Sequence, residues 1–210
     1  MRDMDNMPAA PGEDVSCAVA LVNTRRMSAG SEVDVLADPV TSGQWLTERG
    51  LLAGRPGPAG PDAAPDAGPD GGTDGAPDCT AARLRALREA VRALFAARFD
   101  GRQPGPADLA LVNAALLAAP LIALLAWDEA GPRRGERPAG ADPLAVALAR
   151  IANDALAVLT APDGPELAPC AAHGCIRWFL RTHAARQWCS NRCGDRVRAA
   201  RHYARLRTQA

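Results

Sequence analysis

Four cysteines near the end of the chain have the spacing of metal ligands. They form a C-x4-C pair and a C-x3-C pair with thirteen residues between the pairs: Cys170, Cys175, Cys189 and Cys193. Two close pairs joined by a short insert can present four thiolates to one tetrahedral Zn2+. The second pair is spaced i, i+4, so both sulfurs would lie on one face of a helix, for which Ser190 is a candidate N-cap. The spacing therefore predicts one structural zinc ion.

Two other interpretations of these cysteines are a pair of disulfides or four unrelated buried thiols. Disulfides need an oxidising compartment, whereas the polar and acidic start of the chain predicts no secretory signal, so we expect a cytoplasmic protein. Four of the six cysteines also fall within twenty-four residues, which favours a shared ligand. His173 and His183 lie inside the cluster, and either could replace a cysteine as a ligand.

The net charge changes sign at the start of this cluster. Residues 1–169 contain 15 Arg and 23 carboxylates, a net charge of −8, whereas residues 170–210 contain nine Arg and one carboxylate, Asp195, a net charge of +8. The chain contains no Lys, so only the clustering of Arg is informative. A basic segment joined to an acidic one points to an anionic partner.

The segment after Cys193, GDRVRAARHYARLR, has a helical period. Val197, Ala200 and Ala204 would share the face of Cys193, and the arginines would occupy the two flanks. Such a helix could reach both backbones of a nucleic-acid groove. The candidate nucleic-acid contacts are Arg186, Arg192, Arg196, Arg198, Arg201 and Arg205. The alternative is a purely structural zinc site whose arginines only keep the module soluble.

The rest of the chain has the pattern of a mainly α protein with a short strand pair. Helix signals occur within 34–52, with Thr41 or Ser42 as N-cap, over 80–99, from Pro106 to before Pro120, and after an Asp142 N-cap. The helix over 80–99 has an apolar face, and its arginines should form a solvated surface: Arg83, Arg85, Arg88 and Arg92.

Four shorter segments complete this expectation. The apolar stretch 17–24 fits a strand or a helix, with Asn23 and Thr24 as a buried cap or turn. Residues 121–127 should form a buried strand and residues 128–140 an exposed turn and loop. Between the cysteine pairs, the alternation of aromatic and Arg residues over 176–188 predicts a small β-hairpin.

Two stretches should be disordered, and one is apolar enough to raise the question of a membrane. Residues 1–14 should be a disordered leader, as chain termini often are. Residues 53–79, rich in Pro, Gly and Asp, should be a flexible insert, because they cannot bury enough apolar surface. Residues 109–127 contain no charge. They do contain Asn113 and Pro120 and lack cationic flanks, so we expect no membrane span.

The run WCSNRCGDR with its basic helix resembles the CGNR zinc-finger family. In that family the final cysteine opens a Cys-Gly-Asn-Arg motif, which here reads Cys193, Gly194, Asp195, Arg196. The resemblance implies a treble-clef-like finger, over 166–210, with the four cysteines as zinc ligands. The Asp in place of Asn puts a carboxylate beside the metal, where it could cap locally or pair with Arg196, and it would weaken contact with a phosphate.

The upstream part resembles the ABATE domain, the usual N-terminal partner of that finger. The similar features are VNT at 22–24, Asp34 with Leu36, Trp45-Leu46, and LxxLR at 84–88. The resemblance implies a helical domain over 15–162 and a family proposed to act in stress-related transcription control.

We therefore expect a zinc-dependent DNA-binding transcription regulator, located at the nucleoid. Its helical body would sense an unidentified small molecule or stress signal, and it is also a candidate for homodimerisation. An RNA- or protein-binding adaptor is the alternative. We expect no catalysis, because four cysteine ligands leave a zinc ion no open position and the sequence shows no nucleophile–base constellation.

Overall fold

The computed structural model describes residues 8–28, 30–52, 77–140, 142–162, 164 and 166–209. Most of the predicted insert, residues 53–76, and the first half of the predicted leader, residues 1–7, lie outside this set. The described part is mainly helical, as expected, and its strands form antiparallel pairs. In chain order the elements are α1 (Cys17–Val22), β1 (Arg25–Ser28), β2 (Ser31–Asp34), α2 (Pro39–Glu48), α3 (Pro77–Asp100), α4 (Pro106–Ala118), β3 (Leu121–Asp128), β4 (Gly131–Pro138), α5 (Pro143–Thr160), β5 (Leu167–Pro169), β6 (Trp178–Leu180) and α6 (Asn191–Gln209).

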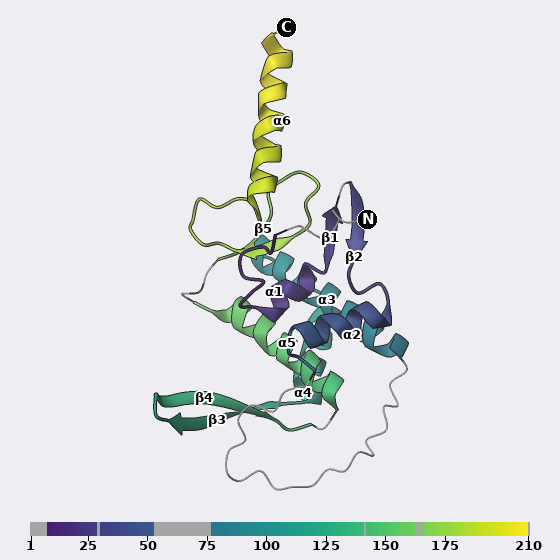
Figure 1. Ribbon diagram of the computed structural model, residues 1–210, viewed down its shortest axis with the longest axis vertical. Coiled ribbons are helices and arrows are strands. Elements are labelled where there is room, and N and C mark those ends of the chain that lie inside the picture. The colour runs from purple at the N-terminus through teal and green to yellow at the C-terminus, as the bar shows by residue number, and fades with distance from the viewer. Residues whose placement is uncertain are drawn as a thin grey trace.

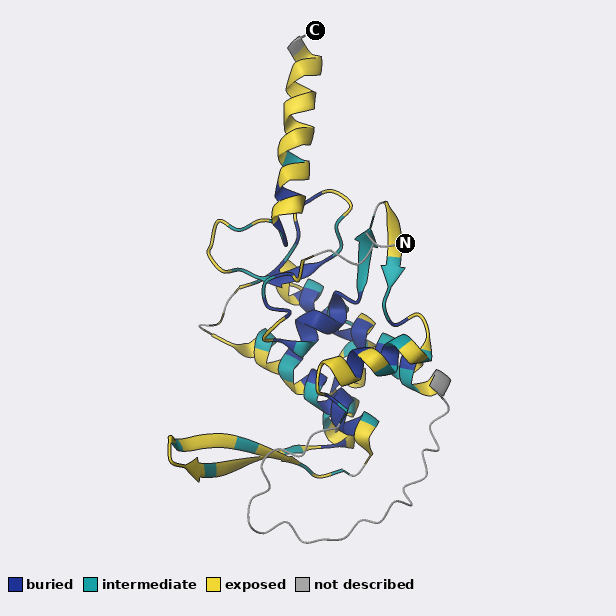
Figure 2. Cartoon of the chain, viewed as in Figure 1, coloured by how far each residue is buried: buried dark blue, intermediate teal, exposed yellow. Residues whose placement is uncertain are grey.

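The core of the body forms around the short helix α1, which contacts α3 and α5 (Figure 1). Its residues 18–22 are at most 3% exposed and belong to the dark-blue centre of Figure 2. Ser16 accepts the Val19 N–H, and Asp154 of α5 accepts the Ala18 N–H at 2.8 Å. The stretch 17–24 is thus helical at its start, because Ser16 caps the buried helix end and α5 supplies a second acceptor for its N–H groups.

Helices α2 and α3 both begin earlier than predicted. The N-cap of α2 is Asp38, not Thr41 or Ser42, because its carboxylate accepts the N–H groups of Val40 and Thr41, and Pro39 occupies the first turn. Helix α3 begins at Pro77, so the last residues of the predicted insert belong to it. Helix α4 has its predicted bounds, and Asp142 caps α5 by accepting the Leu144 N–H.

The apolar face of α3 is buried as expected, but three of its arginines form hydrogen bonds within the protein, among them Arg85, which donates to the Leu36 carbonyl at 2.7 Å. Arg88 is 3% exposed and donates to both the Asp34 carboxylate, at 2.8 Å, and the Thr24 hydroxyl. Arg92 donates to the Val22 carbonyl at 2.7 Å. A buried guanidinium must be paired, and here the loop after α1 and strand β2 supply the acceptors. Burial lowers the pKa of Arg92. Burial also acts to lower the pKa of Arg88, but the hydrogen bonds and negative charges of Asp34 and Glu89 together outweigh it and raise that pKa.

The prediction for residues 121–140 is wrong in two respects. Strand β3 forms, but most of it is exposed rather than buried, and residues 131–138 form its partner β4 rather than a loop. The pairing runs from Leu121 opposite Pro138 to Asp128 opposite Gly131, whose φ of 105° closes the turn. The sequence of β4 does not have the pattern of a strand, because it is rich in Pro, Gly and Arg. The segment forms a strand nonetheless, because pairing with β3 compensates for the low strand propensity of these residues.

One helix in the described ranges, α5, is long and apolar enough to cross a membrane. Its residues pack against α1, α3 and α4, and 44% of the apolar window is buried inside the body. The core helix of a folded domain passes the same test of length and composition.

Candidate metal centre and arginine helix

The first cysteine pair lies in the loop of a short hairpin. Strands β5 and β6 pair antiparallel, with Ala168 opposite Phe179, and Cys170 and Cys175 lie between them. The Cys170 N–H donates to the Arg177 carbonyl at 2.9 Å, and Gly174, with φ of 71°, makes the turn. The β-hairpin of the finger is therefore upstream of the place predicted, because its first strand precedes the cysteines and its second carries the aromatic residues.

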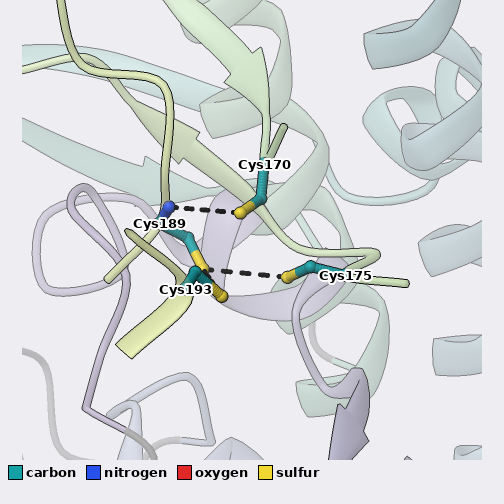
Figure 3. A group of neighbouring side chains, drawn as sticks. All are labelled: Cys170, Cys175, Cys189 and Cys193. Carbon is teal, nitrogen blue, oxygen red and sulfur yellow. Dashed lines mark hydrogen bonds between the residues drawn. The ribbon is translucent and has the colours of Figure 1, made fainter. Parts of the chain in front are cut away.

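The second pair lies at the start of α6. Cys189 precedes the helix, Cys193 is in its first turn, and the Ser190 hydroxyl accepts the Cys193 N–H at 3.3 Å as the N-cap. The Cys189 N–H also donates to the Cys170 sulfur at 3.4 Å, which ties the two cysteine pairs together (Figure 3). The thiol groups thus converge from the hairpin loop and the positive end of a helix, which favours thiolates.

The four sulfurs have the spacing of a tetrahedral metal site. All lie within 4.8 Å of one another, with Sγ–Sγ distances of 3.8 Å between Cys175 and Cys189 and 3.7 Å between Cys189 and Cys193. A tetrahedron with Zn–S bonds of about 2.3 Å has edges of about 3.8 Å, whereas a disulfide has an S–S bond of about 2.05 Å. The arrangement therefore fits one metal ion and not paired disulfides. His173 and His183 are exposed and are not part of this group.

The electrostatics of the four thiols also favour a cation. Hydrogen bonds from Cys175 and Cys189 lower the pKa of the Cys170 thiol to about 2. The hydrogen bond with Cys170 in turn raises the pKa of Cys175 to about 11, and it raises the pKa of Cys189 as well. One thiolate thus suppresses ionisation of its neighbours. A dication at the centre would remove this repulsion, because each sulfur could then carry its charge.

The finger is attached rigidly to the helical body through β6. Trp178 is part of the main core, where its ring meets Phe95 edge-on at 5.8 Å. The Asn23 side chain, at the end of α1, accepts the Trp178 N–H and donates to the Trp178 carbonyl, both at 2.8 Å. Arg92 donates to the Ile176 carbonyl at 3.0 Å. From the sequence, Asn23 is expected only to cap or turn the chain locally, and its position in the VNT motif is the one sign of a further role.

The predicted leader is ordered from residue 8 onward and takes part in this attachment. Glu13 is buried, accepts from Arg177 and Asn23 at 2.6 Å each, and so neutralises a buried guanidinium. The Leu180 N–H donates to the Pro11 carbonyl at 2.8 Å, next to Gly12, where a side chain would collide with Leu180. Residues 8–14 bury little apolar surface, and backbone and charge contacts with the finger order them instead.

Helix α6 leaves the metal centre and projects away from the rest of the molecule (Figure 1). Val197 still packs against the cysteine cluster, but every residue from 198 to 208 is exposed (Figure 2). Ala200 and Ala204 therefore lie on the face of Cys193 without any surface to cover.

The six arginines predicted to contact nucleic acid fall into two groups. Arg186 lies over the Phe179 ring at 5.9 Å, Arg196 donates to the His173 carbonyl at 3.0 Å, and Arg198 donates to Asp195 at 2.6 Å. The other three are exposed and form no ion pair or hydrogen bond with any residue that the structure describes: Arg192, Arg201 and Arg205.

Comparison with known families agrees with the resemblance seen in the sequence. Residues 16–162 match the family model ABATE, described as "Putative stress-induced transcription regulator", and residues 167–206 match the CGNR zinc finger. No curated protein matches the chain. With the sulfur geometry, the finger match confirms the prediction of one structural Zn2+. Neither family description is that of an enzyme.

Proposed function

Because this chain belongs to the ABATE family and ends in a CGNR zinc finger, we propose that it is a transcription regulator that binds DNA through α6. In this proposal the body receives the stress signal to which the family description refers, and the protein acts in the cytoplasm, at the nucleoid. It has no catalytic role, because a zinc ion with four thiolate ligands keeps no open position for a substrate.

The zinc ligands in this proposal are the four clustered cysteines. The ion would hold the β5–β6 loop against the first turn of α6, the arrangement of a treble clef, and so fix the direction in which the helix leaves the body. The role of the zinc ion in this proposal is structural, since the ion positions the residues around it and none of them contributes a reacting group.

The exposed arginine surface of α6 carries the proposal. The helix contains six Arg and one carboxylate over nineteen residues, and its outer half touches nothing else in the described chain. At 1.5 Å per residue it is about 28 Å long, and an α-helix of this kind fits the major groove, which is about 12 Å wide. Unpaired guanidinium groups on an isolated helix gain most from phosphates, because no internal acceptor has to be given up.

The arginines then have separate roles. The three without a partner, Arg192, Arg201 and Arg205, would pair with phosphates directly. Arg186 and Arg196 brace the finger through a backbone carbonyl each and would contact DNA at its edge. Arg198 is tied to Asp195 and would contribute least.

A salt titration of DNA binding tests this proposal. The zinc-loaded triple variant Arg192→Ala/Arg201→Ala/Arg205→Ala should bind duplex DNA more weakly, and the slope of log K against log salt should fall by about 2 to 3, since each phosphate contact contributes about 0.9. The matched control removes three exposed arginines elsewhere, Arg98→Ala/Arg134→Ala/Arg137→Ala, and should behave as wild type. If the two triple variants bind alike, α6 is not the DNA surface. If single-stranded RNA displaces the duplex at equal length and salt, the adaptor alternative replaces the DNA proposal.

A further inference from the structure

The hairpin β3–β4 exposes a large apolar surface that nothing in the described chain covers. It projects from the end of the body opposite α6, as exposed ribbon in Figure 2. Leu125 and Trp127 are 77% and 73% exposed, and Leu117, which precedes the hairpin, is 76% exposed. An isolated two-stranded hairpin is only marginally stable in water, and several large apolar side chains exposed on it favour an interaction with a partner.

The backbone hydrogen bonds identify which groups of the hairpin are free. The Ala139 N–H donates to the Pro120 carbonyl, and the pairing continues in register to Asp128 opposite Gly131. Because bonded and non-bonded pairs alternate in an antiparallel ladder, the even-numbered residues of β3 bond to β4. The N–H and C=O groups of four odd-numbered residues therefore point outward along the free edge of β3: Leu121, Ala123, Leu125 and Trp127.

The free edge of β4 is protected and that of β3 is not. The residues of β4 with outward-facing backbone groups lie opposite the four of β3, and they are Pro132, Arg134, Glu136 and Pro138. Two of these lack an N–H and the other two are charged, which are the usual devices that prevent a strand from pairing further. No residue from 121 to 127 is charged or Pro.

We propose that β3 pairs antiparallel with β3 of a second copy of this chain, forming a continuous four-stranded sheet across a two-fold axis. The charges favour this occupant. Two β3 edges meet without any charge from residues 121–127, whereas the arginines of β4 lie on the outer strands and stay apart. Pairing through β4 would instead place Pro132 and Pro138, which have no N–H to donate, in the new ladder. It would also set Arg133 opposite the partner's Arg137, although Arg134 would face a carboxylate. The proposal goes beyond the DNA-binding function and does not depend on it.

The free groups also fix the register. All four outward-facing residues pair only if the axis passes through Leu124, which sets Leu121 opposite the partner's Trp127 and Ala123 opposite the partner's Leu125. Leu124 then faces its own copy in a non-hydrogen-bonded pair, where the Cα atoms are about 4.5 Å apart. Because α6 leaves from the other end of the body, both arginine helices remain free in this dimer (Figure 1).

Cysteine cross-linking tests the pairing and its register together. In a background with the exposed Cys79→Ser, the zinc-loaded variant Leu124→Cys should oxidise to a disulfide-linked dimer, since the Cα separation lies within the range of disulfides. The control Gly135→Cys places a thiol opposite Leu124 on the other strand, away from the paired edge, and should form no disulfide-linked dimer under oxidation. The remaining thiol outside the finger, Cys17, should not interfere, because burial and the Asp154 carboxylate raise its pKa to about 12.

A second variant tests the association without oxidation. Leu125 is exposed in the single chain, so Leu125→Lys should leave zinc content and circular dichroism unchanged while raising the dimer dissociation constant at least about tenfold in sedimentation experiments. Three results would overturn the proposal. One is a wild-type protein that stays monomeric at about 100 μM. Another is equal cross-linking of the two cysteine variants. The third is a monomer whose hairpin binds neutral lipid vesicles, which would make a membrane surface the occupant.

Discussion

At the scale of single residues, one substitution in the finger motif has a visible effect. Asp195 stands where the family motif has Asn, and it pairs with Arg198 at 2.6 Å, not with Arg196 as the sequence suggested. Arg196 instead reaches across to the His173 carbonyl and joins the two sides of the metal centre. The carboxylate therefore pairs with one guanidinium on the flank that we propose binds DNA, and it adds a negative charge where the proposal places phosphates.

Restoring the family residue should strengthen DNA binding. The variant Asp195→Asn releases Arg198 and removes a repulsive charge, so affinity at about 150 mM salt should rise by about three- to tenfold, and the salt slope should steepen by about 0.9. Fluorescence anisotropy with labelled duplex measures both quantities. The double variant Asp195→Asn/Arg198→Ala should lose most of the gain, because the cycle isolates the contribution of the released arginine. Equal affinity for the single and double variants would contradict this assignment.

At the scale of elements, β6 and α6 differ in what holds them. One edge of strand β6 pairs with β5. On the other edge, the Asn23 side chain at the end of α1 bonds to both the N–H and the carbonyl of Trp178, as a neighbouring strand would. Helix α6 is held only through its first turns, and the rest has no tertiary contact in the described chain. The attachment of β6 to the body therefore holds the base from which the exposed part of α6 projects.

Removal of the Asn23 amide should therefore destabilise the whole finger attachment. Asn23→Ala leaves the buried Trp178 N–H and carbonyl unpaired, and the free energy of unfolding should fall by about 2–4 kcal/mol in urea titration. Asn23→Asp should cost at least as much, since a carboxylate cannot donate to the Trp178 carbonyl or to Glu13. The control Asn113→Ala, on the exposed side of α4, should change stability by less than about 0.5 kcal/mol. A similar effect of all three variants would rule out this role for Asn23.

At the scale of the whole molecule, body and finger pack against each other and share a core. The ring of Trp178 lies in the core of the body, Arg92 of α3 bonds to the Ile176 carbonyl, and Arg177 bonds to Glu13. Zinc that holds the β5–β6 loop therefore also supports contacts deep in the helical part.

Metal removal should then lower the stability of the entire chain. Zinc at about a thousandfold excess over its dissociation constant contributes about 4 kcal/mol, which corresponds to a shift of about 10 °C in melting temperature for a chain of this size. Calorimetry should show one transition, which moves down on chelation and returns when zinc is added back. Two transitions, with that of the helical body unchanged by chelation, would show that the finger folds independently.

The sequence by itself determined the features that depend on neighbouring residues. Cysteine spacing identified the group that converges on the metal, Ser190 and Asp142 marked helix starts, and the 3.6-residue period gave the buried face of α3. The change of charge sign separated the basic module from the acidic body. The helix signals lie within a few turns of chain, where residue type largely fixes the local geometry, and the cysteine and charge patterns need only the order of residues along the chain. The assignment of arginines to DNA remains a prediction.

The tertiary structure alone decided the features that depend on distant partners. Asn23 meets Trp178 across 155 positions, and Arg177 meets Glu13 across 164, so no local pattern could reveal the attachment or the order of residues 8–14. Arg88 is buried because β2 offers a carboxylate, and residues 131–138 form a strand because β3 lies beside them. Buried polar and charged groups must find a hydrogen-bonding partner. Because these partners are far away in the sequence, only the folded chain shows which residue each group pairs with.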